Sequence, residues 1–264
     1  MAMETDPRKF AFIACVNDPA QYAVCERHIA ALRLPPGFTV EKLPIEGARG
    51  MAEGYNAALR RTDARYKVYL HQDTYVRDPD LLFHLLNLFR EPEVGLVGVV
   101  GASRLPASGV WYEAGLHSFG KVWEYRRGGG LWHLLGPFNR RREHLMRFRP
   151  VRRPYQPVVV ADGLFIATQY DLEWREDLDF GFIYYEGPQC LEFIKAGYKV
   201  IVPHQERVWC MHYGPPDEAA ATKSPAYRGR FRRNLEVFRR EYGEFIGVPV
   251  EELLRRYVRA HPPR

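Results

Sequence analysis

Residues 66–78 read YKVYLHQDTYVRD, an apolar run that ends in His71-Gln72-Asp73. The run from Tyr66 to Leu70 has the length and the aromatic and β-branched content of a buried strand. Asp78-Pro79 follows, and an Asp before a Pro is typical of the start of a helix. The stretch therefore predicts a buried strand with a carboxylate at its carboxyl end, followed by a helix over residues 79–89.

Strand-like and helix-like segments alternate on both sides of this stretch. Phe10 to Val16 (FAFIACV) is continuously apolar, as in a parallel strand buried on both faces. Strands are expected over residues 10–16, 38–43, 66–70 and 94–100, and helices over residues 21–34, 51–61 and 79–89. This alternation predicts an α/β fold with an open, mostly parallel twisted sheet flanked by helices, Rossmann-like in character. Ligands of such sheets bind beyond the carboxyl ends of the strands.

The alternation stops at Gly101. Residues 101–157 are rich in Gly, Trp, Tyr and Arg and predict a long irregular excursion without a second core. A strand over residues 158–167 then follows, interrupted by Asp162-Gly163. Later elements are expected as a helix over residues 189–196 ended by Gly197, strands over 198–202 and 208–212, and a helical tail over 227–257.

Composition limits the classes of protein. The 264 residues are 46% hydrophobic and 27% charged, as in ordinary globular proteins. No apolar stretch reaches the roughly 18 residues of a membrane span, and the N-terminal apolar run lacks the features of a signal peptide. The four cysteines have no close paired spacing, which fits a reducing cytoplasm. We therefore expect a soluble, cytoplasmic protein.

Arginine carries most of the net charge of +6. It gathers in Arg140-Arg141-Arg142, in Arg152-Arg153 and in the tail from Arg228 onward. Such patches suit nucleic acid, an anionic substrate or an anionic membrane surface. No helix-turn-helix, zinc-finger or aromatic RNA-binding signature accompanies them, so no nucleic-acid partner is expected. A peripheral contact with the inner face of the membrane stays open.

Five segments together resemble a known family. His71-Gln72-Asp73 resembles the metal motif of bacterial inverting GT-A-fold glycosyltransferases, in which a strand ends Asp-x-Asp or His-Gln-Asp. The other segments are Cys15-Val16-Asn17-Asp18, GMAEGYNAAL of residues 50–59, ADGLFIAT of residues 161–168, and FGFIYYEGPQCL of residues 180–191, which is followed by Ala196-Gly197-Tyr198 and then His212. The resemblance covers residues 10–213, with 101–157 poorly matched, and the chain is similar to the large family-two glycosyltransferases.

The resemblance implies a role for each matching residue. Asp73 and His212 would hold a divalent metal ion, Mn²⁺ or Mg²⁺. Asn17, Asn56, His71 and Gln72 would line the nucleotide-sugar pocket. Glu186 would be the catalytic base, with Asp162 beside the donor sugar and acceptor. The family often has Asp at the position of Glu186 and a second acid three residues on, where this chain has Gln189, and Asp177 and Asp179 lie nearby in sequence.

Domain limits follow from the same resemblance. Residues 1–218 would be a GT-A-like catalytic domain, with 8–100 as the nucleotide-sugar half, 101–157 as the variable excursion and 158–218 as the acceptor half. Residues 219–264 would be a helical tail. Arginines of the excursion would approach the phosphates of the donor.

The implied reaction moves a sugar from a nucleotide-diphosphate-sugar donor to a carbohydrate, lipid-linked or protein acceptor with inversion. A metal ion would stabilise the leaving diphosphate, and a carboxylate would take the proton of the acceptor hydroxyl. Two other interpretations stay open: a nucleotidyltransferase, disfavoured by Asn17-Asp18-Pro19 where a Gly-rich phosphate loop would be expected, and an inactive nucleotide-sugar-binding scaffold.

Overall fold

A seven-stranded mixed sheet forms the centre of the protein. The computed structural model describes residues 4–127, 141–214 and 224–258. The strand order is β2-β1-β3-β11-β5-β12-β9, in which β2, β1 and β3 are parallel, as are β5 and β12, while β11 and β9 run antiparallel to their neighbours. The strands are β1 (Asp6–Val16), β2 (Thr39–Glu46), β3 (Ala64–Leu70), β5 (Val94–Gly98), β9 (Tyr155–Pro157), β11 (Phe165–Thr168) and β12 (Lys199–Pro203).

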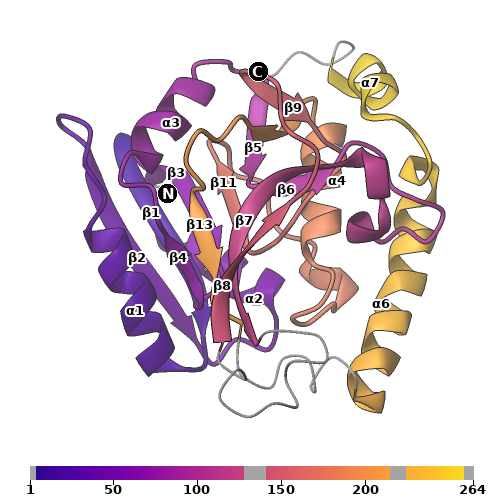
Figure 1. The fold of residues 1–264 in the computed structure, drawn as a ribbon, viewed down its shortest axis with the longest axis horizontal. Coiled ribbons are helices and arrows are strands. Elements are labelled where there is room, and N and C mark those ends of the chain that lie inside the picture. The colour runs from indigo at the N-terminus through magenta and orange to yellow at the C-terminus, as the bar shows by residue number, and fades with distance from the viewer. Residues whose placement is uncertain (1–3, 128–140, 215–223, 259–264) are drawn as a thin grey trace.

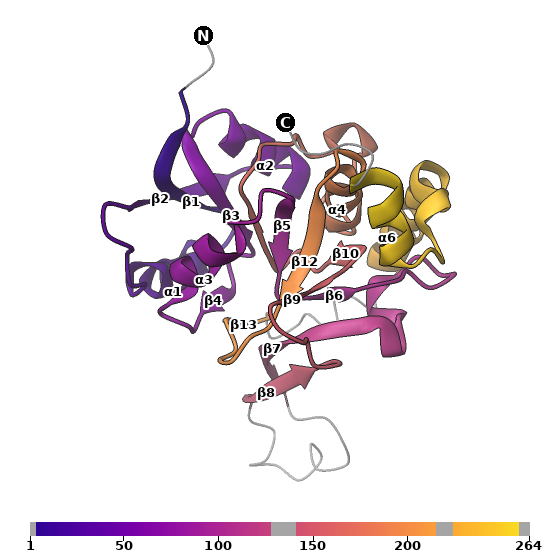
Figure 2. The ribbon, with the colours of Figure 1, turned by 90° about the horizontal axis from the view of Figure 1, so that it is seen from above.

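Helices cover both faces of this sheet, with α1 and α3 on one face and α2 and α4 on the other (Figure 1 and Figure 2). The end of α1 meets the start of α3, where the Arg33 amide donates to the Pro79 carbonyl at 2.9 Å. The helices are α1 (Pro19–Ala30), α2 (Met51–Leu59), α3 (Leu81–Leu88) and α4 (Glu186–Lys195). These elements confirm the predicted open α/β fold.

A second, smaller sheet lies against the first. Its order is β10-β6-β7-β13-β4, with β8 paired to β7. The strands are β4 (Thr74–Val76), β6 (Val100–Ala102), β7 (Ser118–Arg127), β8 (Arg141–Arg147), β10 (Val160–Ala161) and β13 (Cys210–His212). About half of the described residues between 101 and 157 lie in strands, and two 3₁₀ turns lie at Trp111–Glu113 and Gly115–His117, so the predicted excursion is irregular only in part.

Two other local predictions need correction. Residues 158–167 do not form one strand, because the chain leaves the small sheet after β10 and enters the large sheet as β11. Helix α3 begins at Leu81 with Asp80 as its N-cap, not at Pro79 with Asp78. The Asp78 carboxylate instead accepts a hydrogen bond from the Asp80 amide at 3.0 Å, which shapes the turn before the helix.

The tail is helical, as predicted, and packs on α4. It comprises α6 (Pro225–Tyr242), a 3₁₀ turn (Gly243–Phe245), α7 (Val250–Leu253) and a π-type turn (Leu254–Val258). Phe238 and Tyr242 of α6 are buried in the same core as the sheet. Gly187 permits this approach, because a Cβ there would lie 3.0 Å from the Phe238 ring. In the described part of the chain, no helix is long and apolar enough to cross a membrane. The predicted boundary at residue 218 lies outside the described residues.

Close backbone approach between β6 and β10 of the small sheet generates a stability prediction. A Cβ on Gly101 would meet the backbone oxygen of Val160 well inside van der Waals distance, whereas one on Gly229, inside α6, would meet open space. Gly101→Ala should lower the free energy of unfolding by about 1–3 kcal/mol through overpacking. Gly229→Ala, the matched control, should raise it by about 0.5–1 kcal/mol. Urea unfolding measures both, and equal effects would contradict the proposed contact.

Candidate active site

Asp73 lies where the two sheets meet. It follows β3 of the large sheet and precedes β4 of the small one. β4 pairs antiparallel with β13, so that Thr74 lies opposite His212, and the Tyr213 amide donates to the Asp73 carbonyl at 2.8 Å. This pairing brings the predicted metal residues Asp73 and His212 together, although 138 residues separate them in the chain.

Asp73 is flanked by two imidazoles. Its Oδ2 lies 3.5 Å from His212 Nε2, and its Oδ1 lies 4.0 Å from His71 Nδ1. One ligand atom from each of these three residues lies within 4.8 Å of the others. The group therefore offers two nitrogens and one carboxylate oxygen to a single cation. Sequence reasoning placed His71 in the wall of the pocket, and the structure adds it to the candidate ligand group.

The residues of this group shift one another's pKa values. Burial by itself raises the pKa of Asp73, but the hydrogen bond to His212 and the charges of both imidazoles outweigh it, so the pKa is lowered. Burial also lowers the pKa of His71, against the opposing effect of Asp73. The site therefore favours an ionised carboxylate beside a neutral His71, the forms that bind metal ions.

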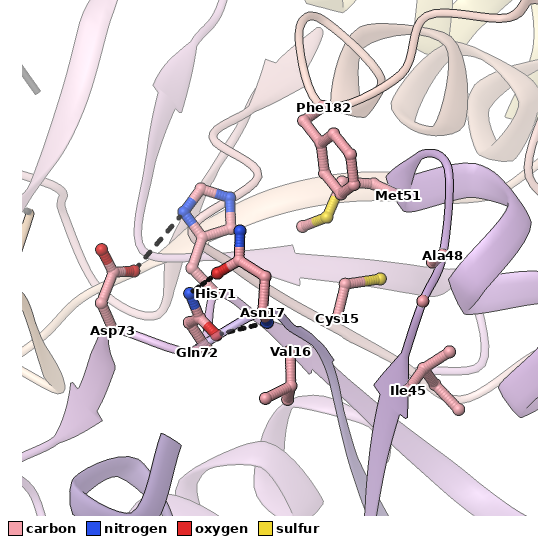
Figure 3. Close-up of a pocket in the computed structure, with 11 residues that line it drawn as sticks. Cys15, Val16, Asn17, Ile45, Ala48, Met51, His71, Gln72, Asp73 and Phe182 are labelled. Atoms are coloured by element: carbon pink, nitrogen blue, oxygen red, sulfur yellow. Dashed lines mark hydrogen bonds and ion pairs between the residues drawn. The ribbon is translucent and has the colours of Figure 1, made fainter. Parts of the chain in front are cut away.

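A pocket of about 260 Å³ opens beside this group (Figure 3). Asp73 lies at one end, and apolar side chains form the other. His71 separates Asp73 from Phe182, whose side chain is 55% exposed. The pocket is lined by Cys15, Val16, Asn17, Ile45, Gly47, Ala48, Met51, His71, Gln72, Asp73 and Phe182. Three predicted donor-contacting residues, Asn17, His71 and Gln72, thus share one cavity.

Gln72 joins the ends of β1 and β3. Its Oε1 accepts from the backbone amides of Asn17 at 2.9 Å and Asp18 at 3.0 Å, and its Nε2 donates to Asn17 Oδ1 at 2.5 Å. The loop after β1 is thereby held against the pocket. Gln72 lines the cavity, but its amide is occupied by this loop.

Asp162 lies near both His71 and Glu186. The Asp162 carboxylate accepts from the Leu164 amide at 2.8 Å, in the turn between β10 and β11. Glu186 is the first residue of α4, and the neighbouring Gly163 packs against it, since a Cβ at 163 would lie 3.2 Å from Glu186 Cβ. Burial and then the nearby Asp162 raise the pKa of Glu186 to about 8. The structure therefore brings the two predicted acids together.

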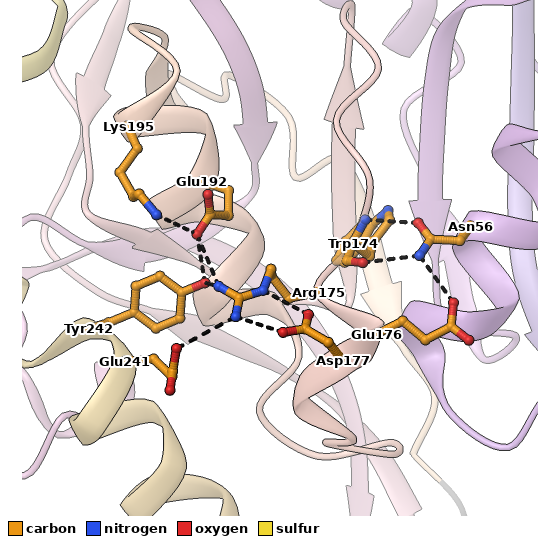
Figure 4. Close-up of polar contacts among 9 residues, drawn as sticks. All are labelled: Asn56, Trp174, Arg175, Glu176, Asp177, Glu192, Lys195, Glu241 and Tyr242. Atoms are coloured by element: carbon orange, nitrogen blue, oxygen red, sulfur yellow. Dashed lines mark hydrogen bonds and ion pairs between the residues drawn. The ribbon is translucent and has the colours of Figure 1, made fainter.

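Asn56 lies outside this group. It is buried in α2, where its amide accepts from the Trp174 amide at 2.8 Å and donates to the Trp174 carbonyl at 3.0 Å (Figure 4). A further contact reaches Glu176. These bonds hold the segment that leads to α4, and the predicted contact of Asn56 with the donor has no support in this geometry.

The same segment is tied to the tail. Arg175 donates to Asp177 Oδ1 at 2.7 Å and to the Tyr242 hydroxyl of α6 at 2.9 Å, and Tyr242 donates to Glu192 of α4 at 2.8 Å (Figure 4). Asp177 is therefore engaged with Arg175, and Asp179, which is exposed, lies 3.5 Å from Arg233. Neither alternative acid has the burial of Glu186.

One site residue had no signal in the sequence. Tyr185 is buried, and its hydroxyl lies 2.7 Å from His71 Nε2. Only its position next to Glu186 could have marked it.

Of the predicted arginine cluster, Arg140 lies outside the described residues, as do the side chains of Arg141 and Arg142.

The fold is that of a GT-A-like protein. The profile of the glycosyltransferase-like family matches residues 11–233, and the chain belongs to this family.

Two solved structures are similar to the chain to different degrees. S. aureus TarS 1–349 in complex with UDP-GlcNAc is similar with a TM-score of 0.50 and 8% identity, over 96% of this chain and 72% of that chain. The mannosyltransferase PcManGT from Pyrobaculum calidifontis in complex with GDP-Man and Mn²⁺ has a TM-score of 0.47 and 14% identity, over 95% and 79% of the two chains. No curated protein is similar enough in sequence to count as a match.

The raised pKa of Glu186 predicts a pH-dependent stability. Above pH 4.5 the unfolded chain releases the proton of this carboxyl, while the folded protein keeps it until about pH 8. The folded state then binds more protons, so Glu186 lowers the free energy of unfolding progressively as the pH rises through this window. Glu186→Gln should remove this cost, which is absent below pH 4.5.

We expect the free energy of unfolding of Glu186→Gln to exceed that of wild type by on the order of 2 kcal/mol at pH 8.5 and to be almost equal to it at pH 4. Urea unfolding at both pH values measures the difference. Glu244→Gln, which changes an exposed carboxylate, is the control. A gain that is the same at both pH values would contradict the shifted pKa.

Proposed function

We propose that the protein transfers a sugar from a nucleotide-diphosphate-sugar donor to an acceptor hydroxyl, with metal assistance and inversion at the anomeric carbon. The observation that carries this proposal is the grouping of His71, Asp73 and His212, of which His71 and Asp73 also line the pocket. Membership of the glycosyltransferase-like family supports the reaction class.

The shape of the pocket suggests how the donor lies. Val16, Ile45 and Met51 form an apolar end that suits a nucleobase and ribose. The diphosphate would then point towards Asp73, and the sugar would extend past His71 towards Asp162 and Glu186. The volume of about 260 Å³ accommodates part of a nucleotide-sugar.

The donor atoms fit a divalent transition metal. Imidazole nitrogens suit Mn²⁺ better than Mg²⁺, which prefers an all-oxygen shell with several waters. His71, Asp73 and His212 would therefore hold Mn²⁺, with diphosphate oxygens completing its shell. A cation bound there supplies Lewis-acid stabilisation of the leaving nucleoside diphosphate.

Glu186 is the proposed base. It would accept the proton of the acceptor hydroxyl as the oxygen forms its bond to the anomeric carbon and the bond to the diphosphate breaks on the opposite face. A single displacement of this kind inverts the configuration. Asp162 would orient the sugar and raises the proton affinity of Glu186. The acceptor class and the predicted contact with an anionic membrane surface stay predictions.

Ligand-induced stabilisation tests the donor and metal together. In a thermal-shift screen of UDP, GDP, UDP-GlcNAc and GDP-mannose with Mn²⁺, with Mg²⁺ and without metal, one nucleotide at saturation should raise Tm by about 5 °C or more in the presence of Mn²⁺, less with Mg²⁺ and not without metal. Asp73→Ala should remove the Mn²⁺-dependent part and lower donor hydrolysis at least about 100-fold. Glu244→Ala, at an exposed carboxylate, should match wild type.

The outcomes separate three interpretations. A Tm that does not change with any nucleotide would contradict the proposal. Binding without hydrolysis or transfer would favour the inactive scaffold. Equal responses with Mn²⁺ and Mg²⁺ would argue against the two imidazoles as ligands.

The pKa of Glu186 also predicts a pH profile. Because the base must be ionised, kcat for Mn²⁺-dependent donor hydrolysis should rise with pH and level off above about pH 8. Glu186→Gln should lower kcat by about 100-fold or more and abolish the rise of kcat with pH. A wild-type profile that is flat from pH 6 to 9 would show that another group is the base.

A further inference from the structure

Tyr185 links the candidate metal group to the backbone next to Asp162. Its side chain is only 5% exposed, and its hydroxyl has two partners on different elements. His71 Nε2 lies 2.7 Å away, and the Gly163 carbonyl lies 3.1 Å away. The position of the protons in this chain of hydrogen bonds follows from the chemistry of its ends.

A carbonyl oxygen can only accept a hydrogen bond, and a phenol has one proton to donate. The Tyr185 hydroxyl therefore donates to the Gly163 carbonyl. Its oxygen then accepts from His71, so that Nε2 carries the imidazole proton. The neutral ring consequently has its lone pair on Nδ1.

The lone pair on Nδ1 faces the carboxylate. Nδ1 lies 4.0 Å from Asp73 Oδ1, too far for a hydrogen bond between them. Two electron-rich atoms at this separation suit a cation bound between them. In the other tautomer, a proton on Nδ1 would occupy the ligand position and would favour a hydrogen bond to Asp73.

Packing holds the tyrosine in place. A Cβ on Gly163 would overlap the Tyr185 hydroxyl, so the backbone can approach this closely only at a glycine. The rings of Tyr55 and Trp174 pack on the other sides of Tyr185, with centroids 6.0 and 5.9 Å away. The phenol therefore has little freedom to leave His71.

We propose that Tyr185 is a positioning residue that holds His71 in its Nε2–H tautomer, so that Nδ1 is the third protein ligand for the divalent cation. The inference rests on the proposed function only for the identity of the cation. The tautomer itself is a property of the metal-free protein. Outer-shell partners of this kind alter metal affinity by about 10–100-fold when removed.

The chain offers a matched control in the adjacent residue. Tyr184 is also buried, and its hydroxyl also donates to a backbone carbonyl, that of Gly109. Gly109 is not a residue of the metal group. Tyr184→Phe therefore removes the same chemical group from the same segment without altering the proton arrangement of His71.

The first measurement is ¹⁵N NMR of the metal-free protein with ring-labelled histidine. His71→Gln assigns the His71 signals among the nine histidines. Wild type and Tyr184→Phe should both show a protonated Nε2 and an unprotonated Nδ1 at His71. Tyr185→Phe should show a mixture of tautomers or a protonated Nδ1. An Nδ1–H tautomer in wild type would overturn the proposal, whether or not the variant folds.

The second measurement is the affinity for Mn²⁺, followed by the EPR signal of the free ion. Tyr185→Phe should weaken binding about 10–100-fold, and Tyr184→Phe should leave it within about two-fold of wild type. Equal losses in both variants would overturn the positioning role and indicate a general effect of packing. Mn²⁺ binding that is insensitive to Asp73→Ala would instead refute the proposed metal site, and the NMR result would still decide the tautomer.

Discussion

The pairing of β4 with β13 is the constraint on which the rest of the site depends. Each strand has three residues, yet their antiparallel register places Thr74 opposite His212 and brings Asp73 to the imidazole. Side chains alternate across a strand, so a slip of one residue would turn His212 to the opposite face of the sheet. The small sheet is therefore part of the candidate site. It supplies one of the three candidate ligands, while the turn after β3 supplies the other two.

Sequence patterns correctly predicted the elements that are determined by residues close together in the chain. The buried parallel strands β1 and β3 are continuous apolar runs, and Asp73 follows one of them at the edge where ligands of such sheets bind. The change of sheet between β10 and β11 left no trace, because both strands are equally apolar across Asp162-Gly163. The β7–β8 hairpin was missed for a different reason. Its strand residues carry many charged and aromatic side chains, since part of the hairpin faces solvent, and their alternation resembles irregular sequence.

Long-range polar contacts were beyond the reach of such patterns. Asn56 and Gln72 are both amides near the carboxyl edge of the sheet, and both were expected to contact the donor. The structure uses them to bind backbone, Asn56 at Trp174 and Gln72 at the loop after β1. Buried backbone groups without partners are costly, and an amide can satisfy a donor and an acceptor at once. The residue type therefore fits both roles, and only the fold distinguishes them. Tyr185 is the opposite case. It belongs to no sequence motif, yet its hydroxyl contacts Nε2 of His71, which lies 114 positions earlier in the chain.

Asp73 and Glu186 acquire different properties from their surroundings. Asp73 has its pKa lowered because His212 and His71 face it, whereas the half-buried Glu186 has its pKa raised by desolvation and by the nearby Asp162. A carboxylate that stays ionised suits a cation and a leaving diphosphate, and one that binds a proton readily suits an incoming hydroxyl. His71 Nδ1 lies 4.0 Å from Asp73, and His71 Nε2 lies 2.7 Å from the hydroxyl of Tyr185, which immediately precedes Glu186 in the chain. A change at Tyr185 would thus reach both halves of the site, whereas a change at Tyr184, whose hydroxyl bonds to Gly109, would reach neither by the same route.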